Sequence, residues 1–179
     1  MIEQRISLIF KVVLFCLLFW GFAPQARAQE KLKKLQTPVL SAKLMRNYTL
    51  EEATLLKEPY NPEDDFIYHW EYWENWVSRD GNTRIHVWIF EFKIPRGPEN
   101  LAGFMVENAS LEEAPDKKFG EKTWVRSSYD AAENRGDWRI LYIKGKMLVE
   151  VDGDGPRGER PPYLPDFVES LGRIIESKI

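Results

Sequence analysis

One segment constrains the fold more than any other: residues 83–94, with the sequence TRIHVWIFEFKI, are mostly β-branched or aromatic. Such side chains favour extended backbone because they pack well on a pleated surface. The preceding residues Asp80, Gly81 and Asn82 are typical of a tight turn between antiparallel strands. Near-continuous apolarity indicates a strand that is covered on both faces. We therefore predict a central strand that follows a hairpin turn.

The segment before this turn, residues 66–77, fits two periodicities. A strand would place five aromatic side chains on one face: Phe66, Tyr68, Trp70, Tyr72 and Trp76. A helix would gather a narrow apolar stripe: Phe66, Trp70, Trp73 and Val77. Aromatic enrichment and the adjacent turn favour the strand. The helix remains the open alternative.

The other elements follow from capping, spacing and turn residues. Thr49 and Glu52 have the spacing of a capping box, which predicts a short helix over 50–57. A second helix is predicted after Pro98, and strands over 122–127, 137–143 and 146–151. Residues 153–162 have the glycine-rich and proline-rich composition of an exposed irregular loop. From Leu164 the apolar spacing predicts an amphipathic helix.

This order of elements predicts an α+β fold. We expect a mostly antiparallel twisted sheet of about five strands, with the helices packed on one face in a two-layer arrangement. Residues 49–179 would form this single domain, and the lysine-rich residues 29–48 an N-terminal linker.

The first 28 residues have the features of a secretory signal peptide. Arg5 and Lys11 precede an apolar run over 12–22, and residues 26–28 match the A-x-A cleavage pattern. The run spans eleven residues, whereas a membrane-crossing helix needs about 20. We predict cleavage after Ala28 and a periplasmic or secreted protein. An uncleaved segment, the alternative, would be the only contact with a membrane.

Composition excludes several kinds of site. Cys16 is the only cysteine and lies inside the signal segment, so the exported chain would have no disulfide, thiol nucleophile or cysteine-ligated metal. The whole chain carries a net charge of −3, and without the signal segment 22 basic and 27 acidic side chains remain. Such an acidic body argues against nucleic acid as a partner. No sequence motif predicts a cofactor.

The two histidines, His69 and His86, suggest a metal site, but strand geometry argues against it. A turn centred on Asp80 and Gly81 pairs residues whose numbers sum to 161, which places His86 opposite Asn75. His69 then lies six residues away along the strand, at roughly 20 Å. That distance is too long for shared coordination, and no metal ligand is assigned.

Catalytic constellations are weak in this sequence. Glu150, Asp152, Asp154 and Glu159 have the carboxylate density that a calcium site or a glycosidase pair would use. A glycine-rich loop, however, holds catalytic groups poorly. No serine lies in a G-x-S-x-G or S-x-x-K pattern. Catalytic activity is therefore the minor hypothesis, and no catalytic residue is assigned.

Aromatic density is the feature that exceeds what an ordinary domain needs. Four tryptophans lie within the predicted hairpin: Trp70, Trp73, Trp76 and Trp88. Bulky aromatic residues can simply fill a cysteine-free core, but one face of this hairpin has more of them than a single helical layer would cover. We therefore predict a non-catalytic exported domain that binds a protein partner or a small amphipathic ligand through these tryptophans. The alternatives are an envelope-acting hydrolase and a calcium-stabilised module, both using the carboxylates at 150–159.

Overall fold

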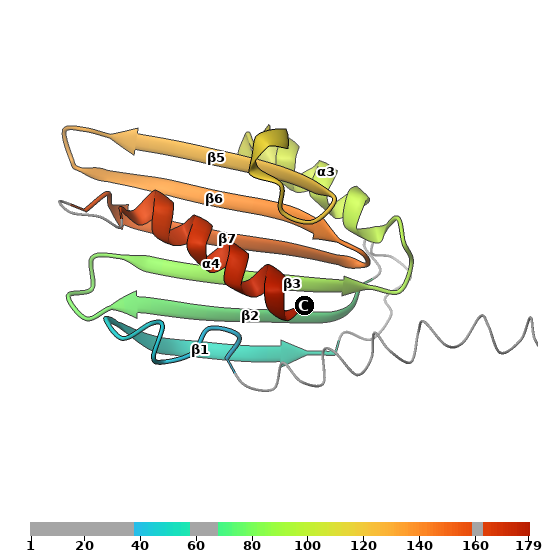
Figure 1. Cartoon of the computed structure of the whole chain (residues 1–179), viewed down its shortest axis with the longest axis horizontal. Coiled ribbons are helices and arrows are strands. Elements are labelled where there is room, and N and C mark those ends of the chain that lie inside the picture. The colour runs from blue at the N-terminus through green and yellow to red at the C-terminus, as the bar shows by residue number, and fades with distance from the viewer. Residues whose placement is uncertain (1–37, 58–67, 159–162) are drawn as a thin grey trace, which may run out of the picture. The chain divides into compact units, whose positions relative to one another are not determined.

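The fold is built on one antiparallel sheet. The computed structural model describes residues 38–57, 68–158 and 163–179. Seven strands pair in the order β1-β2-β3-β7-β6-β5-β4, and every pairing is antiparallel (Figure 1). The strands are β1 (Tyr48–Leu56), β2 (Tyr68–Ser78), β3 (Arg84–Phe92), β4 (Glu112–Glu113), β5 (Lys122–Asp130), β6 (Arg135–Lys144) and β7 (Met147–Pro156). The predicted α+β class is confirmed, whereas the predicted strand count of about five is wrong.

The β2–β3 hairpin forms as predicted. Asn75 pairs with His86, which is the register that a turn centred on Asp80 and Gly81 requires. Asp80 accepts hydrogen bonds from the Ser78 hydroxyl and the Asn82 backbone N–H, and Gly81 has a φ of +75°. Residues 68–78 are therefore strand rather than helix, while Phe66 lies outside the described residues.

The predicted helix over 50–57 is wrong, because this segment is strand β1. It pairs along β2 at the edge of the sheet, with a register shift between Leu50 and Glu52. A capping-box pair stabilises only a few backbone groups, whereas pairing with β2 satisfies the whole ladder. Tertiary pairing therefore overrides a local helix-start signal.

Residues 38–47, which the sequence pattern placed in the linker, pack onto the sheet; we call them the strap. Val39, Leu40 and Met45 are buried. Glu74 of β2, itself fully buried, accepts hydrogen bonds from the backbone N–H groups of Val39 at 2.8 Å and Leu40 at 3.1 Å. One buried carboxylate thus holds the strap against the sheet.

Helix α4 (Leu164–Lys178) covers one face of the sheet. Its buried side includes Val168, Leu171 and Ile175. On the sheet, alternate residues of the central strands point toward it, among them Ile85, Val151 and Tyr142. The amphipathic helix predicted from Leu164 is therefore confirmed, and it forms the larger core.

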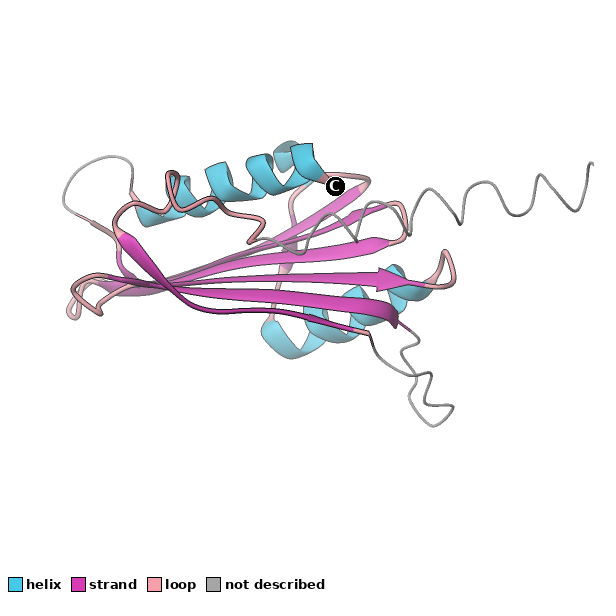
Figure 2. Ribbon diagram, turned by 90° about the horizontal axis from the view of Figure 1, so that it is seen from below, coloured by secondary structure: helices cyan, strands magenta, loops and turns pink. Residues whose placement is uncertain are grey.

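Helix α3 (Gly97–Ala109) lies on the opposite face, so the prediction of helices on one face is wrong (Figure 2). It packs at one end of the sheet over Phe92, Leu141 and Leu148. The physical reason is that β3 carries apolar side chains on both faces, so each face is stabilised by packing against other residues. The near-continuous apolarity of residues 83–94 already indicated this.

The predicted loop over 153–162 is also partly wrong. Residues 153–156 belong to strand β7, and Gly153 is buried. A Cβ atom on Gly153 would lie 2.5 Å from the Val168 side chain of α4. The glycine therefore allows close approach of helix and sheet, although the local composition indicated a turn. Residues 159–162 lie outside the described part of the chain.

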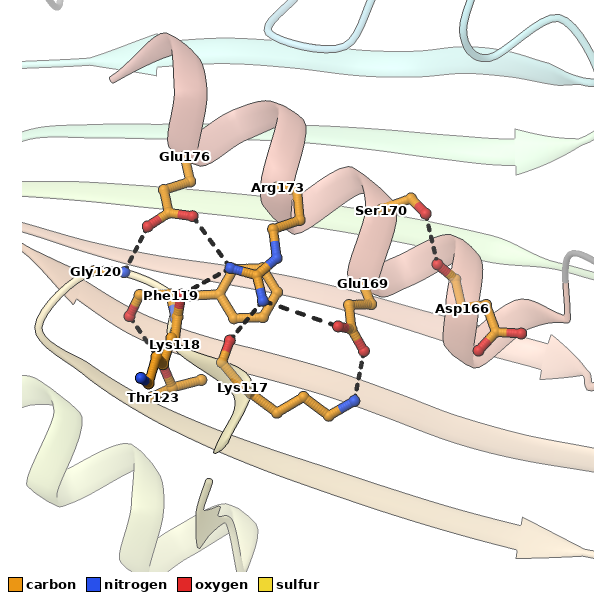
Figure 3. Close-up of polar contacts among 10 residues, drawn as sticks. All are labelled: Lys117, Lys118, Phe119, Gly120, Thr123, Asp166, Glu169, Ser170, Arg173 and Glu176. Atoms are coloured by element: carbon orange, nitrogen blue, oxygen red, sulfur yellow. Dashed lines mark hydrogen bonds and ion pairs between the residues drawn. The ribbon is translucent and has the colours of Figure 1, made fainter. Parts of the chain in front are cut away.

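Hydrogen bonds and a cation–π contact join α4 to the segment before β5, where the 3₁₀ helix η2 (Pro115–Lys117) lies (Figure 3). The Arg173 guanidinium lies 3.7 Å from the centroid of the Phe119 ring. It also donates hydrogen bonds of 2.7 Å to the backbone carbonyls of Lys117 and Lys118. The Gly120 N–H donates to Glu176 at 2.6 Å. These contacts fix the edge of the sheet to the helix.

Candidate functional site

Beyond the region under α3, the sheet face opposite α4 carries rows of aromatic and charged side chains. Strand pairing aligns Trp73, Trp88 and Glu150 in one row, and Asn75, His86, Asp152, Arg139 and Arg126 in the next. Among the described residues, the apolar cluster under α3 contains none of these side chains. We call the set formed by these two rows and Asp137 the open face.

The four predicted tryptophans are divided between the two faces. Trp73 and Trp88 pair across β2 and β3 on the open face, and both are partly exposed. Trp76 is 3% exposed and lies on the α4 face, opposite Ile85. Trp70 is partly exposed and pairs with Glu91, with the Lys57 ammonium 5.8 Å from its ring centroid. Only Trp73 and Trp88 therefore form one aromatic surface.

His86 contributes to the open face as a packed polar residue. Its Nδ1 lies 2.6 Å from Asn75 Oδ1, and its ring stacks on Trp88 at 5.7 Å between centroids. Burial, followed by the positive charge of Arg84, lowers the pKa of His86. Neutral imidazole is therefore the expected form at pH 7. His69 lies elsewhere on β2, and no group of three potential metal ligands occurs in the described ranges.

A charged cluster lies beside the tryptophans. Arg139 Nη1 is 3.0 Å from Glu150 Oε1, and its Nη2 is 3.7 Å from Asp152 Oδ2. Arg126 Nε is 3.3 Å from Asp137 Oδ2. Glu150 is 1% exposed and Asp152 is 8% exposed, so both carboxyl groups are held in a water-poor environment. Such groups tolerate burial only with partners of this kind.

The environment of Asp152 favours its protonated form. Burial, a hydrogen bond with Asp137 and neighbouring negative charges raise the pKa of Asp152 to about 8, although Arg139 opposes the shift. A protonated Asp152 donates this hydrogen bond to the Asp137 carboxylate. Burial also raises the pKa of Glu150. The open face thus holds a hydrogen-bonded contact between Asp152 and Asp137, which the sequence analysis missed because it left Asp137 out.

The four carboxylates that the sequence singled out do not form one group. Glu150 and Asp152 point to the same face of β7 and share Arg139. Asp154 is paired with Arg135 at 3.4 Å, and its side chain is 49% exposed. Glu159 lies outside the described residues. Asp137 comes near these carboxylates through the pairing of β6 with β7, in which Asp137 lies opposite Asp154. Predicting that pairing from the sequence would have added Asp137 to the group.

Comparison with known proteins gives a likeness in fold. No family model matches the sequence, and neither does any curated protein. The solved structure of the extracellular domain of PknH from Mycobacterium tuberculosis matches with a TM-score of 0.52. The two chains are 9% identical, and the match covers 76% of this chain and 88% of that one. At this identity the likeness concerns the fold alone.

No helix in the described ranges is both long enough and apolar enough to cross a bilayer.

Proposed function

We propose that this protein is an exported, non-catalytic binding domain whose open face captures an amphipathic ligand or an amphipathic segment of a partner protein. The observation that carries the proposal is the cross-strand pair of Trp73 and Trp88, which is partly exposed beside a charged cluster. Trp side chains supply a large apolar contact area with a polar N–H. An amphipathic ligand matches a surface that offers both kinds of contact.

Two features support export. The first 28 residues have the composition of a secretory signal, and the fold resembles that of an extracellular domain.

The contribution of Trp70 and Trp76 to binding is indirect in this proposal, because both lie on the sheet face opposite Trp73 and Trp88, and Trp76 is buried there.

The test is a fluorescence and calorimetric titration with three probes: octyl glucoside below its micelle concentration, an uncharged oligosaccharide and an amphipathic peptide. We expect at least one to bind, and Trp73→Ala and Trp88→Ala each to weaken that binding by about tenfold. Tyr129→Ala is the matched control, since Tyr129 is an aromatic residue that is 43% exposed and belongs to β5. Binding that is equally strong in both tryptophan variants would contradict the proposal.

A hydrolase is the second candidate, because the open face brings the carboxyl groups of Asp137 and Asp152 into a hydrogen bond. Two carboxyl groups that share a proton are the arrangement of an aspartic protease, whereas a glycosidase holds its two carboxyl groups about 5 Å or more apart. Asp152→Asn distinguishes the two functions. In a hydrolase it abolishes turnover of an envelope peptide, whereas in a binding domain no turnover exists to be lost.

A further inference from the structure

A cleft of about 380 Å³ lies away from the open face. It is bounded by the end of the strap, the start of β1, the end of β7 and the start of α4. Its lining residues are Leu44, Arg46, Asn47, Tyr48, Thr83, Pro156, Arg157, Gly158, Leu164 and Phe167. This size and mixture of apolar walls with a few polar groups are typical of sites for small molecules.

One wall of the cleft is aromatic. The rings of Tyr48 and Phe167 stack with centroids 5.6 Å apart and an interplanar angle of 14°. Leu44 and Leu164 add aliphatic surface. A flat apolar body can pack against such a wall, because stacked rings present a smooth and rigid surface.

Arg157 lines the cleft, and its guanidinium packs against two rings that are not among the lining residues. Its guanidinium carbon lies 5.2 Å from the ring centroid of Tyr163 and 5.9 Å from that of Tyr129. Its backbone carbonyl accepts a hydrogen bond from the Leu164 N–H, which ties it to the first residue of α4. Within the described ranges, no carboxylate forms an ion pair with Arg157. Its N–H donors are therefore available to an acceptor.

The charged side chains among the described lining residues are basic. Arg46 and Arg157 both line the cleft, and the described part of the lining contains neither Asp nor Glu, although Asp80 lies near enough that burial and its charge together raise the pKa of Tyr48. Helix α4 begins at the cleft with Leu164, and the N-terminal end of a helix carries a partial positive charge. Two arginines with no carboxylate among the described lining residues favour an anion.

We propose that this cleft is a second binding site, which takes a small organic anion. The flat apolar body of the anion packs against Tyr48 and Phe167, and its carboxylate, sulfonate or phosphate group pairs with Arg157 and Arg46. This site lies outside the open face and does not depend on the function proposed for that face.

The experiment uses three probes of similar shape and different charge: 2-naphthoate, neutral 2-naphthamide and the 2-naphthylmethylammonium cation. Calorimetry of the purified protein measures their affinity, and ¹H–¹⁵N spectra locate the site. We expect 2-naphthoate to bind about tenfold more tightly than the amide, since charge-assisted hydrogen bonds are stronger than neutral ones. Backbone signals of Asn47, Thr83 and Gly158 should shift with it.

Arg157→Gln and Arg46→Gln should each lower the affinity for 2-naphthoate by about fivefold to tenfold and leave the amide unaffected. Arg96→Gln is the control, because Arg96 is an exposed arginine at the start of α3 and its replacement changes the net charge equally. Three results would overturn the proposal: equal affinity for anion and amide, unchanged affinity in both cleft variants, or shifts confined to Trp73 and Trp88. The last result would assign the probe to the open face instead.

Discussion

At the scale of single residues, Gly153 shows how tightly α4 is packed on the sheet. A Cβ atom at this position would lie 2.5 Å from Val168, 3.2 Å from Ile85 and 3.3 Å from Leu164. Gly153→Ala should therefore lower the free energy of unfolding by about 1 to 3 kcal/mol in urea titrations. Gly103→Ala in α3 is the control: no atom lies within 4 Å of its added Cβ, so the change should stabilise the helix by about 0.5 to 1 kcal/mol. Equal effects of the two changes would contradict this packing.

Asp152 makes a second prediction at this scale, which concerns pH. Its pKa is about 8 in the folded protein, against 3.8 for an ordinary aspartate. Between these values the folded state binds one more proton than the unfolded state, so stability should fall as pH rises. The free energy of unfolding should fall by up to about 1 kcal/mol per pH unit between the two pKa values, and this fall ends once the pH exceeds 8.

Asp152→Asn removes this titration while its amide can still donate to Asp137. Urea unfolding at pH 5.5 and pH 8.5 should therefore show a flatter pH dependence in the variant. Glu91, whose pKa burial raises to about 7, accounts for part of the remaining slope. Asp154→Asn, an exposed change two residues along β7, should keep the slope of the unaltered protein. An unchanged slope in Asp152→Asn would show that Asp152 is ionised in the fold.

The sequence shows many carboxylates at residues 150–159, but its composition assigned residues 153–156 to a loop, whereas they belong to strand β7. Two glycines among aspartates at 152–155 have the composition of a turn, and the partner that makes Gly153 necessary is Val168, fifteen residues further on. Likewise, Asp137 and Asp152 meet only through the β6–β7 pairing. Local composition does not contain such contacts between distant residues.

At the scale of elements, the strap depends on Glu74. This carboxylate accepts hydrogen bonds from the N–H groups of Val39 and Leu40 and, at 2.6 Å, from the Tyr72 hydroxyl. Glu74→Ala removes the acceptor of the Leu40 N–H and of the Tyr72 hydroxyl, whereas the Val39 N–H still donates to Tyr72 Oη at 3.1 Å. The free energy of unfolding should therefore fall by about 2 to 4 kcal/mol.

Hydrogen exchange checks the same contact directly. The amides of Val39 and Leu40 should both be protected in the unaltered protein. In Glu74→Ala the Leu40 amide should exchange rapidly, whereas the Val39 amide keeps the Tyr72 hydroxyl as acceptor. Glu52→Ala, an exposed change on β1, should leave their exchange unaltered. Protection of the Leu40 amide that survives in Glu74→Ala would mean that other contacts hold the strap.

Elements with long periodic patterns were predictable, and short or edge elements were not. The apolar period of α4 and the aromatic run of β3 extend over enough residues to distinguish helix from strand. Strand β1 has an irregular burial pattern at the edge of the sheet, and β4 has two residues. Their formation depends on the neighbouring strands β2 and β5, which the segments themselves do not encode.

At the scale of the whole molecule, helices α3 and α4 lie on opposite faces of the sheet. Helix α4 crosses one face, whereas α3 packs at one end of the other (Figure 2). On the α4 face Trp76 is buried, whereas on the opposite face Trp73 and Trp88 are partly exposed. The sequence could predict the alternation along the hairpin but not which face each helix covers, because that depends on the connection that follows each strand.

Acrylamide quenching of tryptophan emission tests this division most directly. We expect a Trp73→Phe/Trp88→Phe double variant to lose the readily quenched, red-shifted part of the emission, because partly exposed indoles are accessible to the quencher. Trp76→Phe, by contrast, loses blue-shifted emission that acrylamide does not reach. If the double variant instead loses only blue-shifted, poorly quenched emission, Trp73 and Trp88 are core residues and the open face is not a binding surface.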